Sequence, residues 1–174
     1  MSSVMKAESA SGTKVQQPKQ SKGSLLVVNL RGLVNTRAPV RTTLEQLKVG
    51  RRFNATIVPD DDVHRGMLNL AKEHVAWCEL SGDIAEKLLM GRSEKSTGTR
   101  VSESDISKTH GSFREIASAL EQGKIKLNSI EEIRPFFRLS PPRGGFKRSI
   151  RRQYRDGGIL GPNEMLASLV EKML

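Results

Sequence analysis

The sequence has a single cysteine, few aromatic residues and no long apolar run, and each shortage excludes a class of protein. Because Cys78 is alone, an internal disulfide is impossible and a reducing, intracellular setting is expected. No segment approaches the roughly 20 apolar residues of a membrane-spanning helix, and the first residues lack the apolar stretch of a secretory signal. Aromatic residues make up only 4% of the chain, which predicts a modest, mostly aliphatic core.

Signals of catalysis and of metal binding are also missing. His64, His74 and His110 lack the spacing of metal ligands, and no cysteine cluster accompanies them. The chain contains neither the Gly-Lys-Ser/Thr of a phosphate-binding loop nor the Gly-x-Ser-x-Gly elbow of hydrolases. The sequence therefore predicts no enzyme, no catalytic residue, no metal, no cofactor and no small-molecule substrate.

Three isolated features have simple structural explanations. The three aspartates at residues 60–62 fit the start of a helix, where negative charge is favourable, more economically than a cation site. His74 falls on the inner side of a predicted helix, which favours a hydrogen-bonded core histidine over a ligand. Cys78 lies in an apolar run and is interpreted as a small buried hydrophobe rather than a reactive thiol.

Residues 133–155 contain no acidic side chain but eight basic ones, in a chain with a formal net charge of +10 and a pI of about 10.1. Such a run repels itself unless a polyanion neutralises it. Four of the seven aromatic residues also lie there, around a centre made of Pro141, Pro142, Gly144 and Gly145. A flexible linker, which is the alternative, is expected to lack aromatic residues. The pattern therefore favours a loop that lies on RNA.

The first half of the chain predicts a small α+β fold. Residues 1–23 are poor in hydrophobic residues and are expected to form a disordered basic tail. Strands are expected at residues 24–30, 52–58 and 75–80, and a helix at residues 42–48, by apolar spacing and by the Thr42-x-x-Glu45 capping box. A second helix is expected to start at the aspartates of residues 60–62, with its apolar positions from Val63 onward. The order β-α-β-α-β with short connections predicts a sheet with helices packed against it.

The second half predicts helices and loops without strands. Helices are expected at residues 83–90 and 113–120, a further turn at Ser129, and a last helix that opens at Pro162 and runs to Met173. The Ser112-x-x-Glu115 capping box marks the start of the second of these helices. We divide the chain into a tail (1–23), an RNA-binding core (24–81) and a C-terminal extension (82–174).

A second basic patch follows the first strand, and an unusual glycine follows in the second helix. The patch consists of Arg31, Asn35, Arg37 and Arg41. Arg65 is followed by Gly66, which costs about 1 kcal/mol in helix propensity relative to alanine. Two explanations stay open at this point: tight packing of the helix on the sheet, or close approach of another backbone or of RNA.

Several stretches, in this order, carry a family resemblance. They are LLVVNLRGLVNTRAPVRTTLEQLKVGRRFNATIVPDDD, VHRGMLNLAKEHVAWCEL, PFFRLSPPRGGFKRS and RDGGILG. Their most specific parts are the Arg-Gly-Met of the second helix and the run Ser-Pro-Pro-Arg-Gly-Gly-Phe-Lys. With these motifs, residues 24–174 resemble the ribosomal protein L-thirty family of the large subunit, in its longer archaeal form, whose eukaryotic relative is called L-seven.

The resemblance implies a ferredoxin-like core, a C-terminal extension and no catalysis. It places the protein in the cytoplasm, in the large ribosomal subunit, bound to the large ribosomal RNA near the 5S RNA and beside other ribosomal proteins. Residues that match the family motifs and are thereby implied to contact RNA are Arg31, Asn35, Arg37, Arg65, Arg143, Gly144, Lys147 and Arg148. Arg41 is expected to contact RNA as a member of the basic patch after the first strand. Arg151 and Arg152 depart from the family pattern, so the expectation that they contact RNA rests on charge alone.

Two other classes of protein fit part of the sequence. A chromatin or other DNA-binding protein would share the basic charge, although no recognition helix with clustered Arg or Asn is apparent. A small ferredoxin-like enzyme of the acylphosphatase type could use Arg31 and Asn35 as its anion site. The composition and the resemblance favour the ribosomal interpretation.

Overall fold

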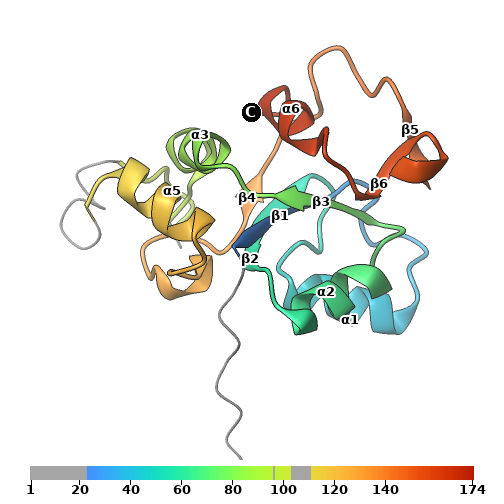
Figure 1. The fold of residues 1–174 in the computed structure, drawn as a ribbon, viewed down its shortest axis with the longest axis horizontal. Coiled ribbons are helices and arrows are strands. Elements are labelled where there is room, and N and C mark those ends of the chain that lie inside the picture. Colours follow the sequence, from blue (N-terminus) through green and yellow to red (C-terminus); the bar gives the residue numbers. More distant parts are fainter. Residues whose placement is uncertain (1–22, 96, 103–110) are drawn as a thin grey trace, which may run out of the picture.

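A computed structural model of the protein describes residues 23–95, 97–102 and 111–174. The predicted basic tail, residues 1–23, lies outside these ranges except for Gly23. Six strands form one sheet in the order β4-β2-β1-β3-β6-β5. Their bounds are β1 Ser24–Asn29, β2 Asn54–Pro59, β3 Val75–Glu79, β4 Phe137–Arg138, β5 Ser149–Gln153 and β6 Gly158–Pro162. The helices surround this sheet in two layers (Figure 1).

Strand β1 is the centre of the sheet and is buried on both faces. It pairs antiparallel with β2 and with β3, and its burial continues along all six residues. Leu25 and Val27 point into one apolar cluster, whereas Leu26 and Val28 point into another. Because neighbouring side chains of a strand point to opposite faces, an uninterrupted apolar run requires a cover on each side of the sheet.

Helices α1 (Ala38–Gln46) and α2 (Asp62–Leu70) cover the first face, where Leu44 and Leu68 are fully buried. With the three antiparallel strands they form the predicted α+β, ferredoxin-like core, which is confirmed. The predicted start of α1 is wrong by four residues. The Thr42 hydroxyl donates a hydrogen bond to the Ala38 carbonyl, so Thr42 lies inside the helix rather than at its start. Pro39 occupies the first turn, where the fixed φ of proline suits a helix.

The second face is covered by helices of the extension. They are α3 (Gly82–Arg92), α5 (Phe113–Glu121) and α6 (Leu166–Glu171), which lie above the sheet in Figure 1, opposite α1 and α2. The predicted capping box of α5 is present: Glu115 N–H donates to Ser112 Oγ, and Ser112 N–H donates to the Glu115 carboxylate. None of the described helices combines the length and hydrophobicity that crossing a bilayer requires.

The prediction that the extension has only helices and loops is wrong, because it contributes β4, β5 and β6. Strand β4 pairs with β2, and β6 pairs parallel to both β3 and β5. Strand β5 is an exposed edge that carries Arg151 and Arg152 and lacks apolar alternation. Charged side chains are a usual feature of edge strands, since they discourage pairing with other chains. The boundary near residue 81 stays a prediction, and strands from both sides of it share one sheet.

Short elements complete the extension and correct two further bounds. The 3-10 helix η1 (Leu127–Ser129) ends at the residue where a turn was expected to begin. Pro162 ends β6 rather than opening a helix, and a turn at Asn163 follows, in which Asn163 Oδ1 accepts from Met165 N–H at 2.9 Å. Helix α6 therefore starts at Leu166. A second 3-10 helix, η2 (Tyr154–Asp156), connects β5 to β6.

Candidate nucleic-acid interface

The topology brings the two basic segments to the same end of the sheet. Val28, near the end of β1, pairs with Ala55 and Ala76, near the starts of β2 and β3. Strand β4 ends there as well, because Arg138 pairs with Asn54. The parallel strands β5 and β6 also begin at this end. Residues 139–148 therefore cross it from one edge strand to the other, as the orange segment of Figure 1 shows.

We call this surface the basic end; it comprises residues 30–37, 48–53 and 139–148. Its parts are joined by contacts at Phe53. The ring of Phe53 stacks on that of Phe146 with centroids 6.1 Å apart, and Leu139 N–H donates to the Phe53 carbonyl at 2.9 Å. Residues that are far apart in sequence are thus adjacent here, and the basic loop lies beside the patch that follows β1.

The loop after β1 is shaped by the buried side chain of Asn29. Its Oδ1 accepts from the backbone N–H groups of Arg31 and Gly32 at 3.1 and 2.8 Å, and its Nδ2 donates to the Val49 carbonyl at 2.6 Å. The Arg31 guanidinium donates to the Glu73 carbonyl at 3.1 Å, so part of its hydrogen-bonding capacity already holds the loop. Farther along the loop, Asn35 (in the left-handed region, φ 55°) and Arg37 are exposed.

The side chain of His74 contacts the backbone of the loop that follows β1. It is buried, and its Nδ1 lies 3.2 Å from the Gly32 carbonyl, which agrees with the prediction of a hydrogen-bonded core histidine. Burial lowers the pKa of His74, and the nearby Arg31 charge lowers it further. A neutral imidazole therefore holds the loop at neutral pH.

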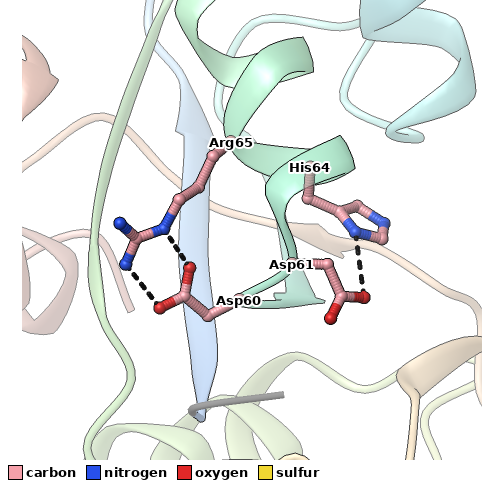
Figure 2. Close-up of polar contacts among 4 residues, drawn as sticks. All are labelled: Asp60, Asp61, His64 and Arg65. Atoms are coloured by element: carbon pink, nitrogen blue, oxygen red, sulfur yellow. Dashed lines mark hydrogen bonds and ion pairs between the residues drawn. The ribbon is translucent and has the colours of Figure 1, made fainter. Parts of the chain in front are cut away.

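Two of the predicted RNA-contacting arginines are paired with carboxylates of this chain. Arg41 Nε donates to Glu45 at 3.1 Å, one turn along α1. Figure 2 shows Arg65 forming a two-point ion pair with Asp60, in which Nη2 lies 2.6 Å from Oδ2. Hydrogen bonding to Asp60 raises the pKa of Arg65. Both arginines carry less uncompensated charge than their sequence pattern indicates.

The aspartates at residues 60–62 are occupied by contacts around the start of α2. Asp60 pairs with Arg65, and the Asp61 carboxylate lies 3.6 Å from His64 Nδ1 (Figure 2). Asp62 occupies the first turn of the helix, as predicted. Within the described ranges, no group of three or more His, Cys, Asp or Glu side chains is arranged to hold a metal ion.

The basic loop of the extension presents its charges to solvent. Pro142 and Gly145 close a turn through a backbone hydrogen bond of 2.9 Å, with Gly144 and Gly145 both at positive φ. The side chains of Arg143, Lys147 and Arg148 are exposed. Among the described residues, no carboxylate forms an ion pair with any of these three, unlike Arg41 and Arg65.

Arg151 and Arg152 lie on β5, at the outer edge of the sheet, and both are exposed. Their strand begins at the basic end and runs away from it, so they extend the basic end along one side of the molecule. Just before this strand, Arg148 lies over the ring of Tyr154, with Cζ 5.2 Å from the centroid. An arginine stacked in this way presents a planar cation suited to bases.

The basic end also contains three basic residues that were not predicted as contacts from the sequence: Lys48, Arg51 and Arg52. All three are exposed between α1 and β2. Arg52 Nε donates to the Leu30 carbonyl at 3.0 Å, and its guanidinium lies 4.6 Å from the centre of the Phe53 ring. The available signal was the local cluster Lys48-x-x-Arg51-Arg52. Lys48 is the last residue of the predicted helix and Arg52 is the first residue of the predicted strand, so the cluster was divided between two elements.

Backbone conformation singles out the same segment. Lys48 and Phe53 have φ values of 61° and 64°, in the left-handed region that residues with a side chain rarely adopt. Phe53 is held there by its neighbours: its N–H donates to the Asn29 carbonyl at 2.7 Å, and its carbonyl accepts from Leu139. Strained backbone concentrates at functional surfaces, where surrounding contacts hold it in place.

Gly66 in α2 has, within the described part of the chain, no neighbour that requires a glycine. A Cβ added there would meet no atom within 4 Å, and the residue is exposed. Tight packing of the helix on the sheet is therefore the wrong explanation. Close approach of an external molecule stays a prediction, and Val63 and Leu70 beside it on the same helix face are 71% and 50% exposed.

We expect the change Gly66→Ala to stabilise the isolated protein by about 0.5–1 kcal/mol, since alanine is the better helix former and has room. Urea unfolding of both proteins measures the difference. Gly157→Ala is the matched control, because a Cβ there also meets nothing within 4 Å but φ is 78°. That control should lose stability. Destabilisation by Gly66→Ala would contradict the assignment.

Cys78 lines a cavity of about 810 Å³ between α2, β3 and η2, together with Arg65, Trp77 and Tyr154. The thiol is partly rather than fully buried, and burial raises its pKa to about 11. The cavity is lined by side chains of both charges: Arg65 and Arg155 are basic, whereas Glu79 and Glu164 are acidic. The unreactive thiol predicted from the sequence agrees with this environment.

We expect Cys78 to react with iodoacetamide at pH 8 about a hundredfold more slowly in the folded chain than in urea, because the thiolate is the nucleophile and is scarce when the pKa is about 11. Mass spectrometry over time measures both rates. Because the pKa of the Cys78 thiol is higher in the folded chain than in the unfolded chain, protonation of the thiol favours the folded state. This contribution to stability is fully present below about pH 9 and is lost as the pH rises toward 11. Equal rates in the two states would refute the environment described.

One family model and several archaeal relatives that share one name are similar to this sequence. The sequence model of the family described as Ribosomal protein L30p/L7e matches residues 25–75. A protein of Nitrosopumilus maritimus named large ribosomal subunit protein uL30 is 37% identical over 152 residues, which cover 87% of this chain and 98% of the relative. A protein of the same name from Ignicoccus hospitalis is 38% identical over 158 residues, covering 88% and 99%. One from Korarchaeum cryptofilum is 36% identical over 153 residues, covering 86% and 94%.

Proposed function

Because the chain belongs to the ribosomal protein L30p/L7e family, we propose that it is a structural constituent of the large ribosomal subunit that binds and stabilises folded ribosomal RNA. The single observation that carries the proposal is the basic end of the sheet. Two basic segments that are distant in sequence meet there through the Phe53–Phe146 stack. The sheet and its two helical layers hold these segments in a fixed relation.

The mechanism is neutralisation of phosphates at fixed positions. Arginine and lysine side chains release counterions from the RNA when they contact its phosphates, which supplies sequence-independent affinity. The spacing between the loop after β1 and the loop of residues 139–148 then selects an RNA shape rather than a base sequence. Such a surface performs no chemical step, and we assign the protein no catalytic role.

The proposed RNA contacts combine the sequence predictions with the residues that the fold adds. On the core they are Arg31, Asn35, Arg37, Arg41, Arg65, Lys48, Arg51 and Arg52. On the extension they are Arg143, Gly144, Lys147, Arg148, Arg151 and Arg152. Arg41 and Arg65 rank below the rest, because each must share its charge with a carboxylate of this chain. Arg65 ranks lowest, since its partner Asp60 directly follows β2 at the end of the sheet opposite the basic end.

The proposed setting is the ribosome in the cytoplasm, with the large ribosomal RNA and neighbouring ribosomal proteins as partners. A position near the 5S RNA belongs to the same proposal. It is supported by the family resemblance and is independent of the geometry of the basic end.

Co-sedimentation with large ribosomal subunits at high salt tests the proposal. We expect the chain to remain with the subunit after washes that remove loosely bound basic proteins. A filter-binding competition supplies the second test: folded large-subunit RNA should displace the chain from duplex DNA, and equal affinity for the two would favour a general DNA-binding protein. Loss of the chain in the washes together with equal affinities would overturn the proposal.

A further inference from the structure

A cavity of about 200 Å³ lies between the basic loop and α6, apart from the outer surface of the basic end. The apolar part of its lining consists of Ile159, Met165, Leu169 and the ring of Tyr154. Ile159 is almost fully buried, whereas Met165 is 56% exposed. The cavity therefore has an apolar interior that solvent can reach.

The backbone holds this cavity open. Ser140 N–H donates to the Met173 carbonyl at 2.9 Å, and Arg143 N–H donates to the Lys172 carbonyl at 3.0 Å, so the loop is fixed to the end of α6. The turn from Pro142 to Gly145 then leads the chain away from the helix before it returns at β5. Both ends of the loop are thus anchored in the fold, and the space beneath it does not depend on a ligand.

Among the described residues that line this cavity, four have cationic side chains and none has a carboxylate. They are Arg143, Lys147, Arg148 and Lys172. Arg148 also stacks on Tyr154, which places a planar cation against an aromatic ring inside the cavity. A free anion would use the cations but not the apolar interior, and an apolar side chain of another protein would use the interior but not the cations. A nucleotide uses both, because a base has apolar faces and its phosphates are anionic.

The size of the cavity restricts the ligand further. At about 200 Å³ it is smaller than the cavities that hold drug-sized molecules, roughly 300 Å³ and above. A base pair within a helix cannot enter, since its bases are stacked and paired. An unpaired base that is turned out of a loop or bulge can.

Resting on the proposed function, we propose that this cavity receives one unpaired base of the ribosomal RNA, while Arg143, Lys147, Arg148 and Lys172 hold the phosphates that flank it. The basic loop then acts as a clamp over a single nucleotide as well as a surface for phosphates. This contact adds a preference for a particular local RNA structure to the charge-based affinity of the basic end.

The test uses the full chain bound to large-subunit ribosomal RNA, with the change Leu169→Trp to fill the cavity. Base reactivity toward dimethyl sulfate and a carbodiimide is measured in the free RNA and in both complexes. We expect one unpaired base that the wild-type chain protects to be reactive again with the variant, while other protected positions stay protected. Affinity should fall about 10- to 100-fold, as for loss of a base stacked on an aromatic ring. The salt dependence should stay unchanged, because the phosphate contacts remain.

The controls separate this proposal from the proposed function. Met90→Trp introduces a tryptophan at an exposed position on α3 that does not line the cavity. This variant should match the wild type in every measurement. Ser168→Trp, at an exposed position on the cavity wall, replaces Leu169→Trp if that variant fails to fold. Protection by the wild type with an identical pattern for the cavity-filling variant would refute the base site alone. The absence of any protection by the wild type would refute RNA binding itself.

Discussion

A chain that ends at residue 81 is expected to lack a cooperatively folded state, although it contains the entire predicted core. Truncation removes α3, α5 and α6, which cover the second face of the sheet. Leu26, Val28, Leu30 and Ile57 would then face water. At about 1.5–3 kcal/mol for each exposed side chain, the loss is comparable to the entire stability of a typical domain.

Urea unfolding followed by circular dichroism measures this effect. The intact chain should show one cooperative transition, whereas the fragment should be aggregated or should unfold without a transition. A soluble fragment with a cooperative transition would contradict the expectation and would establish residues 24–81 as an independent domain.

A point substitution tests the same cover without truncation. Phe137 in β4 is fully buried against this face, so Phe137→Ala should cost about 3–5 kcal/mol. Val34→Ala removes apolar atoms from a side chain that is 82% exposed and should change stability by less than about 0.5 kcal/mol. Similar losses for the two variants would rule out a structural role specific to β4.

Replacing Arg143, Lys147 and Arg148 together by alanine is expected to weaken binding to ribosomal RNA and to leave the fold intact. The three side chains are exposed, and the loop is held by backbone hydrogen bonds that survive the change. The log–log dependence of affinity on salt should become shallower by about 2 to 3, since each lost phosphate contact removes about 0.7 to 0.9 from the slope. Filter binding across a series of salt concentrations measures the slope.

A triple variant with the same loss of charge serves as the control. Arg114, Lys124 and Lys126 are exposed on α5 and just after it. Helix α5 lies near the start of β1, where Ser24 Oγ donates to the Leu120 carbonyl, so these residues are at the opposite end of the strand from the basic end. Equal effects of the two triple variants would mean that only net charge matters. Unfolding of the first variant would make the loop a structural element.

The core strands and the best-capped helix could be predicted from sequence because their signals are local. The apolar run of β1 and the Ser112–Glu115 capping box each lie within a few residues. Strands β4 and β5 could not be predicted in this way. Arg138 and Arg152 belong to a basic stretch that is interrupted by Pro and Gly, and their strands exist because partners distant in sequence, β2 and β6, offer hydrogen bonds.

The candidate interface was predicted in its parts but not in its arrangement. Both basic segments are recognisable from charge, yet their adjacency depends on the antiparallel pairing of β2 with β4 and on the stack of Phe53 with Phe146. Neither contact has a sequence signature. The intramolecular pairing of Arg65 with Asp60 is likewise a tertiary detail, and it lowers the rank of a residue that its motif had favoured.

The stack of Phe53 on Phe146 also has a consequence for the order of events during synthesis. During its own synthesis, the chain is extended past residue 53 long before residue 146 is added. Strand β3 likewise cannot pair with β6 until nearly the whole chain has been made. Contacts between distant residues form slowly, because the intervening chain must first be brought together. The two halves of the basic end therefore cannot become continuous until residue 146 has been synthesised. An RNA that requires both halves would select finished molecules over nascent or misfolded ones.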